Sequence, residues 1–137
     1  IGLGATISEF PTTVVAASAA MKAGMSTIMG APNVVRGRSH SGNVSAIDLA
    51  QKRLLNALSS DYVPSSLLYG AFLLSDKQGC SLPDAIATVT SNPARMANFD
   101  DRGEIKIGLR ADLIQVKRCT DGTPVVRKTF KLGKRVA

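Results

Sequence analysis

The most constraining feature of this sequence is the alternation of short apolar segments with helical segments over its first 77 residues. The apolar segments contain β-branched residues and are short enough for strands, whereas the intervening segments are rich in alanine or leucine. Strands that alternate with helices at this spacing indicate an α/β fold with a parallel sheet. In chain order, strand and helix alternate over residues 3–10, 12–23, 25–30, 45–56, 57–60 and 64–77.

Several predicted helix boundaries carry capping residues. Thr12 or Thr13 can cap the first helix, and Ser45 followed by Asp48 forms a capping-box pattern at the start of the second. Pro64 is predicted to lie in the first turn of the third helix, where proline is tolerated. The segment 31–44 is predicted to be a polar loop.

The pattern changes after residue 80. A capped helix is predicted over 81–90 and a further short helical turn over 91–99, and strands are predicted over 112–117 and 124–130. The Asp-Gly pair at 121–122 favours a turn between these strands, and the last six residues form a third short extended segment. We therefore predict a β/α body over residues 1–98 and a small β-appendage over residues 99–137.

Composition excludes several classes of protein. Apolar residues make up 45% of the chain, which argues against disorder, and no apolar run is long enough to span a membrane. Aromatic residues make up 4%, without tryptophan, which argues against a surface that stacks nucleic-acid bases. Cys80 and Cys119 are far apart in sequence, so we expect small buried thiols in a reducing compartment, the cytoplasm.

The net charge of +7 is concentrated at the carboxyl end of the chain. Two interpretations of this basic segment stay open: it contacts polyanions such as polyphosphate, or it is a solvated strand pair whose lysines protect an exposed sheet edge. The basic residues of this segment, against the single acid Asp121, are Lys117, Arg118, Arg127, Lys128, Lys131, Lys134 and Arg135.

Polar residues follow each of the three predicted strands. Glu9 ends the first, the segment 33–43 follows the second, and Asp61 follows the third. Because the carboxyl ends of parallel strands meet at one edge of a sheet, we expect these three groups to lie together. Asp61 can bind a divalent cation and take a proton from a bound water, or it can cap the helix before Pro64. Glu9 can serve as a metal ligand, a cap or an ion-pair partner.

The segment 30–43, GAPNVVRGRSHSGN, combines guanidinium groups, hydroxyls, amides and the only imidazole of the chain. Arginine matches phosphate oxygens with two parallel hydrogen bonds, so the segment is a candidate phosphate site. It lacks the G-K-[ST] of a Walker loop, and a structural Ω-loop stays an alternative. Its candidate substrate-binding residues are Asn33, Arg36, Arg38, Ser39, His40, Ser41 and Asn43, to which we add Tyr62 beside Asp61.

The segment NPARMANFDDRGEIKIGLRADLIQV resembles the carboxyl-terminal signature of the amidohydrolase superfamily. Four further pieces, ISEFPTT, MGAPNVVRG, SHSGN and SSDYVP, narrow the resemblance to the branch of this superfamily that acts in the carbon–phosphorus lyase pathway of phosphonate metabolism. The resemblance covers nearly the whole chain. One departure is Arg38, which stands where the branch has glycine.

The resemblance implies a (β/α)8 barrel with a divalent metal ion (Zn, Mn or Mg) at the strand ends, plus a small β-sandwich. This chain would supply the last three β/α units and part of the sandwich. Asp61 would be a metal ligand and general base, and Glu9 stands where many relatives have a metal-binding histidine. One histidine cannot supply the H-x-H pair of the superfamily, so we expect upstream chain, or self-association into a homo-oligomer.

The implied activity is the metal-dependent hydrolysis of a ribosyl triphosphate with release of pyrophosphate, so the expected partner is a phosphorylated ribosyl small molecule. Two alternatives stay open. A related amidohydrolase can act on an amide or cyclic imide, because a fold does not determine the substrate. The chain by itself can also be a non-catalytic structural piece.

Overall fold

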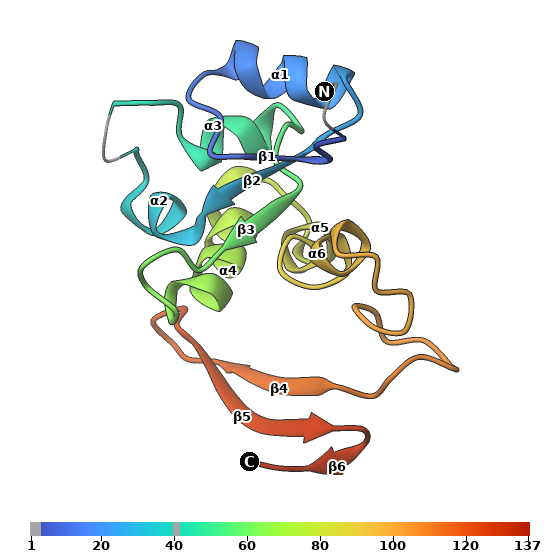
Figure 1. Ribbon diagram of the computed structural model, residues 1–137. Helices are drawn as coiled ribbons and strands as arrows, with labels where there is room; N and C mark the ends of the chain where they lie inside the picture. Colours follow the sequence, from blue (N-terminus) through green and yellow to red (C-terminus); the bar gives the residue numbers. More distant parts are fainter. Residues whose placement is uncertain (1–3, 40–41) are drawn as a thin grey trace.

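The computed structural model describes residues 4–39 and 42–137, except for the side chains of residues 77 and 78. These residues form one parallel and one antiparallel sheet, with helices packed around the parallel sheet (Figure 1). The α/β class predicted from the sequence is therefore confirmed. Within the described residues, no helix combines the length and the apolar character that crossing a membrane requires.

The parallel sheet consists of β1 (Ile7–Glu9), β2 (Ser26–Gly30) and β3 (Ala57–Ser59), in that order. Glu9 pairs with Ile28, and Ile28 pairs in turn with Ala57. Each strand is followed by helical chain, as the alternation predicts. The carboxyl ends of the three strands consequently lie along one edge of the sheet.

Six helices accompany the two sheets in the described residues. Ser45 and Ser81 cap two of them: each hydroxyl accepts a hydrogen bond from the backbone N–H three residues on, at 3.0 and 3.2 Å. Both caps agree with the prediction, and Thr13 caps the first helix in the same way. The helices are α1 (Val14–Lys22), α2 (Ala31–Arg36), α3 (Ala46–Gln51), α4 (Ser66–Gln78), α5 (Leu82–Ala87) and α6 (Ser91–Met96).

The prediction of a polar loop over 31–44 is wrong for its first six residues, which form α2. Pro32 lies in the first turn of α2, where its missing N–H costs no hydrogen bond. Gly37 then ends the helix with a φ of +74°, a left-handed conformation that glycine adopts without strain. A short helix thus holds Asn33 and Arg36 at fixed positions.

Three predicted boundaries also need correction. The second predicted helix, 45–56, ends at Gln51, because Arg53 has a φ of +56° and turns the chain toward β3. The helix expected from Pro64 begins at Ser66. Within the described part of the segment 3–10, only Ile7–Glu9 pairs as a strand.

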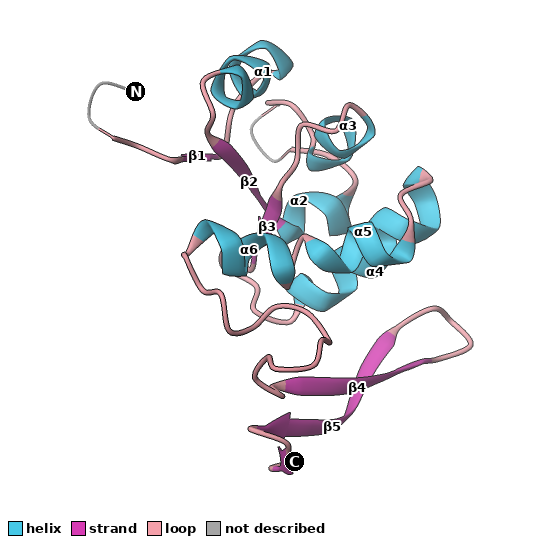
Figure 2. Cartoon of the chain, turned by 90° about the vertical axis from the view of Figure 1, so that its right-hand side faces the viewer, coloured by secondary structure: helices cyan, strands magenta, loops and turns pink. Residues whose placement is uncertain are grey.

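The core lies between the parallel sheet and its helices (Figure 2). Met29 and Leu58, on neighbouring strands, pack with Leu49 of α3 and Leu74 of α4, both of which are fully buried. The buried Thr27 hydroxyl donates a hydrogen bond to the Leu54 carbonyl at 2.5 Å, so this polar group is satisfied. Helix α2 also packs on this face, and it begins directly at the carboxyl end of β2.

The antiparallel sheet consists of β4 (Leu113–Arg118), β5 (Pro124–Lys131) and β6 (Lys134–Arg135), close to the predicted segments. Figures 1 and 2 show this sheet beneath α4, apart from the parallel sheet. The two parts are joined by Arg118, which forms an ion pair with Asp76 of α4 and lies 5.5 Å from the ring centroid of Phe72.

The two cysteines are half-buried, not fully buried as predicted. Burial, followed by the nearby charge of Asp84, raises the pKa of the Cys80 thiol, which favours the neutral form.

Replacing Leu74 with alanine is expected to lower the free energy of unfolding by about 2–5 kcal/mol, because Leu74 is 1% exposed and its loss leaves a cavity. Leu82→Ala is the matched control: Leu82 is also helical but 45% exposed, so the change should stay within about 0.5 kcal/mol. Denaturant unfolding of the protein containing this chain measures both. Equal effects would show that α4 does not form this core.

Candidate active site at the strand ends

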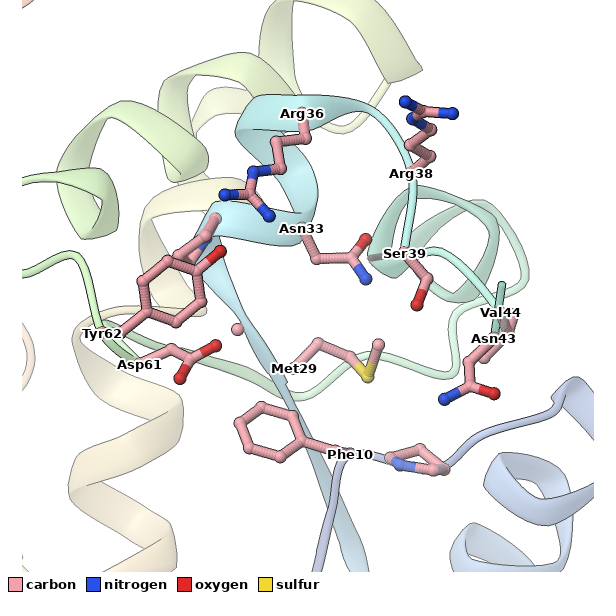
Figure 3. Close-up of a pocket in the computed structure, with 13 residues that line it drawn as sticks. Phe10, Met29, Asn33, Arg36, Arg38, Ser39, Asn43, Val44, Asp61 and Tyr62 are labelled. Atoms are coloured by element: carbon pink, nitrogen blue, oxygen red, sulfur yellow. The ribbon is translucent and has the colours of Figure 1, made fainter. Parts of the chain in front are cut away.

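A hollow of about 240 Å³ lies at the carboxyl ends of the three parallel strands (Figure 3). We call it the strand-end hollow. Its walls come from the segments that follow β1, β2 and β3, which converge as predicted, although Phe10 and Pro11, and not Glu9, line it from the first of them. It is lined by Phe10, Pro11, Met29, Gly30, Pro32, Asn33, Arg36, Arg38, Ser39, Asn43, Val44, Asp61 and Tyr62.

Asp61 is placed against the last residue of β2. A Cβ atom added to Gly30 would lie 2.8 Å from Asp61 Oδ2 and 3.3 Å from Asp61 Cβ. Real Cβ atoms do not approach another atom so closely, so the space that the carboxylate occupies exists because residue 30 is glycine. A strand-end glycine therefore leaves room for the Asp61 carboxylate.

The backbone of Asp61 has a φ of +50°. A positive φ is uncommon outside glycine, although aspartate and asparagine tolerate it better than other residues. The alternative that Asp61 caps the following helix does not hold, because α4 begins at Ser66 with Ser65 at its cap position. This conformation directs the chain out of β3 and brings the carboxylate over Gly30.

Arg36 brings positive charge to the same hollow. Its guanidinium carbon lies 5.5 Å from the ring centroid of Tyr62, the residue after Asp61. Arginine above a tyrosine ring is held by a cation–π attraction of about 0.5–1 kcal/mol at an exposed site such as this one. Figure 3 shows the Arg36 guanidinium turned toward Tyr62, with Asp61 beside that ring.

Asn33 has a structural task as well as a place in the hollow. Its Oδ1 accepts a hydrogen bond of 2.8 Å from the backbone N–H of Ala46, which joins α2 to the start of α3. Arg38, Ser39 and Asn43 line the hollow as predicted. The segment 36–43 therefore contributes guanidinium, hydroxyl and amide groups to one wall.

Other predicted residues lie elsewhere. Glu9 is exposed at the end of β1 and is not among the residues that line the hollow. His40 and Ser41 lie outside the described residues. The apolar side of the hollow was not predicted from the sequence, in which Phe10 and Met29 look like ordinary core residues. Only the folded strand ends bring these two residues into the same hollow as Asp61.

The described residues do not by themselves fit a complete metal site. Among them, no three His, Cys, Asp or Glu side chains lie together as a metal requires. Glu9 pairs with Ile28, and residues 28 and 30 project from the same face of β2, so Glu9 and the Asp61 carboxylate share a face of the sheet. These two carboxylates are partial ligands at most.

Sequence comparison decides the family. The profile of the Amidohydrolase family matches residues 11–136, nearly the whole chain. The chain belongs to the amidohydrolase family. The expectation drawn from NPARMANF and the following glycine-containing segment is thus confirmed.

This amidohydrolase chain is 52% identical, over 136 residues, to alpha-D-ribose 1-methylphosphonate 5-triphosphate diphosphatase of Escherichia coli K12. The match covers 98% of the chain and 36% of that relative's length.

Two solved structures share the fold. An amidohydrolase from Thermotoga maritima aligns with a TM-score of 0.61 at 17% identity, over 97% of this chain and 43% of its own. An adenine deaminase aligns with a TM-score of 0.56 at 18% identity, over 88% of this chain and 38% of the deaminase chain.

The contact between Gly30 and Asp61 predicts strong coupling between the two positions. Gly30→Ala is expected to destabilise the protein by about 1–3 kcal/mol, because the new methyl group overlaps the carboxylate. The Asp61→Gly variant lacks the side-chain atoms that the new methyl group would meet, and glycine tolerates the positive φ at residue 61. In this variant Gly30→Ala should therefore lower the free energy of unfolding far less. A double-mutant cycle by denaturant unfolding measures the difference. The same cost in both backgrounds would contradict the contact.

Proposed function

We propose that the protein containing this chain is a metal-dependent hydrolase of phosphonate metabolism. Its substrate would be ribose 1-methylphosphonate 5-triphosphate, and its products the 5-phosphate and pyrophosphate. The observation that carries the proposal is the strand-end hollow, which Asp61, Arg36 and Arg38 line. The 52% identity to the diphosphatase of Escherichia coli supports the substrate.

The residues of the hollow suit attack of water on a phosphoanhydride. The water oxygen bonds to the α-phosphorus, and the bond from this phosphorus to the bridging oxygen breaks, so that pyrophosphate leaves. Asp61 orients the water and takes its proton. Arg36 stabilises the negative charge that gathers on the phosphoryl oxygens. His40, a candidate substrate-binding residue from the sequence, is assigned the same role in this proposal.

We further propose that these three β/α units belong to a (β/α)8 barrel whose remaining units lie in upstream chain, with residues 99–137 as a separate β-appendage. A divalent ion bound at the strand ends would neutralise phosphate charge and acidify a coordinated water. Asp61 would hold one side of this ion, with Glu9 as a further candidate ligand. The other ligands would come from the upstream part.

The 137 residues alone are proposed to be inactive and to self-associate. β1 leaves one edge of the parallel sheet unpaired within the described residues, and Ile105 and Ile107 are almost fully exposed. Open strand edges and exposed apolar side chains favour association. Light scattering of the isolated chain tests this, and a stable monomer would contradict it.

Asp61→Asn in the full-length protein is expected to lower kcat for pyrophosphate release by about 100-fold to 10,000-fold, because the amide cannot accept the proton. Asp100→Asn is the control, since Asp100 is exposed and distant in sequence from the hollow. Retained turnover in Asp61→Asn would refute the assignment. Release of product from amide or cyclic imide substrates, without pyrophosphate release, would favour the alternative activity.

A further inference from the structure

A second hollow adjoins the strand-end hollow on the far side of the segment that the structure describes at residues 36–39 and 42–43. We call it the outer hollow. It is wider and more open, and it is bounded by this segment and by the first turn of α3. Ile47 is its only fully apolar side chain among the described residues that line it. A hydrophilic ligand therefore fits the outer hollow better than a nucleobase or another aromatic group.

The two hollows share a wall. Arg36, Arg38, Ser39 and Asn43 line both of them. A ligand that passes over this wall would meet guanidinium, hydroxyl and amide groups along its length. Such a set of donors matches a chain of phosphate groups, whose oxygens accept hydrogen bonds at every phosphorus.

The two arginines serve different sides of this wall. Arg36 turns toward Tyr62, and its guanidinium carbon lies 5.5 Å from the ring centroid, so it belongs to the Asp61 side. The Arg38 guanidinium points away from the centre of the strand-end hollow (Figure 3). Arg38 is exposed, and Gly37, with its positive φ, separates the two arginines by a sharp turn.

The charge of the outer hollow is positive overall. Among the described residues that line it, Arg36 and Arg38 are the cations and Asp48 is the one carboxylate. Asp48 is engaged with the cap of α3: its Oδ2 accepts a hydrogen bond of 2.7 Å from the Ser45 hydroxyl. One negative charge against two guanidinium groups leaves the hollow attractive to a multiply charged anion.

We propose that the outer hollow is a subsite for the two terminal phosphates of the substrate, and that Arg38 strengthens the binding of these phosphates. This inference rests on the proposed function, because the scissile bond is placed beside Asp61. With the α-phosphoryl group there, the β- and γ-phosphates extend over the wall formed by Ser39 and Asn43. The leaving pyrophosphate is the part that Arg38 binds.

The test compares Arg38→Ala with wild type in the full-length, metal-loaded protein. We expect the KM for the ribosyl triphosphate to rise about tenfold to a hundredfold, as the loss of a charge-assisted hydrogen-bond pair would cause, with kcat within about twofold. The inhibition constant of inorganic pyrophosphate should rise by a similar factor. That of inorganic phosphate, which has one phosphoryl group and cannot span the wall, should rise much less.

Two further variants sharpen the test. Arg38→Lys keeps the charge but loses the two parallel N–H groups, so it should recover only part of the affinity for pyrophosphate. Lys52→Ala removes one positive charge from an exposed position at the end of α3, outside both hollows, and should leave all constants unchanged. Because Arg38 is exposed, thermal unfolding should show that these variants fold normally.

Different outcomes separate the subsite from the proposed function. Unchanged pyrophosphate inhibition in Arg38→Ala overturns the subsite, and so does an equal weakening of pyrophosphate and phosphate binding, which would be general electrostatic attraction. If wild type releases no pyrophosphate from any ribosyl triphosphate, the proposed function fails instead. Calorimetric titration with inorganic tripolyphosphate then still reads out the subsite, and binding that does not depend on Arg38 overturns it.

Discussion

The parallel pairing of β1, β2 and β3 is the constraint on which the candidate site depends. Parallel strands in register end at the same edge, so Phe10, Gly30 and the segment from Asp61 onward are brought together there. The helical connections pack on the apolar face of the sheet. Helix α2 begins directly at this edge and forms one wall of the hollow. β2 lies in the centre, and its last residue, Gly30, lies beside Asp61 from the segment after β3. Because residue 30 has no side chain, space for the hollow remains beside Asp61.

Local signals in the sequence predicted much of this architecture. The caps at Ser45 and Ser81 were readable because serine followed three residues later by aspartate stabilises a helix start through short-range hydrogen bonds. Convergence of the polar segments was also predictable, since it follows from parallel pairing alone. Helix α2 was missed because its polar residues suggested a loop, although Pro32 and Gly37 mark its two ends.

The contacts that shape the site could not be derived in the same way. Gly30 and Asp61 are 31 positions apart, and their approach depends on the register of β2 with β3 and on the turn after Ser60. The face of the sheet on which Glu9 lies depends on the exact register of β1, because a shift by one residue moves every side chain to the other face. A run of apolar residues does not define the register that closely. The partition of Arg36 and Arg38 between two hollows similarly requires the turn at Gly37.

The basic carboxyl-terminal segment has at least two tasks. Arg118 joins the antiparallel sheet to α4, with a carboxylate and an aromatic ring as partners. Lys134 and Arg135 occupy the short strand β6 beside β5, where exposed charges discourage pairing with another chain. This placement favours the interpretation of the segment as a solvated strand pair with a protected edge.

The left-handed backbone at Asp61 limits what this position can become. Glycine, asparagine, aspartate and histidine are the residues that adopt such a φ most readily, and aspartate alone among them is an anion at neutral pH. A glutamate would keep the charge but lose the conformation, and an asparagine would keep the conformation but lose the charge. If Asp61 is the base that we propose, no other amino acid meets both requirements at residue 61, because the reaction needs the charge and the backbone needs the left-handed conformation.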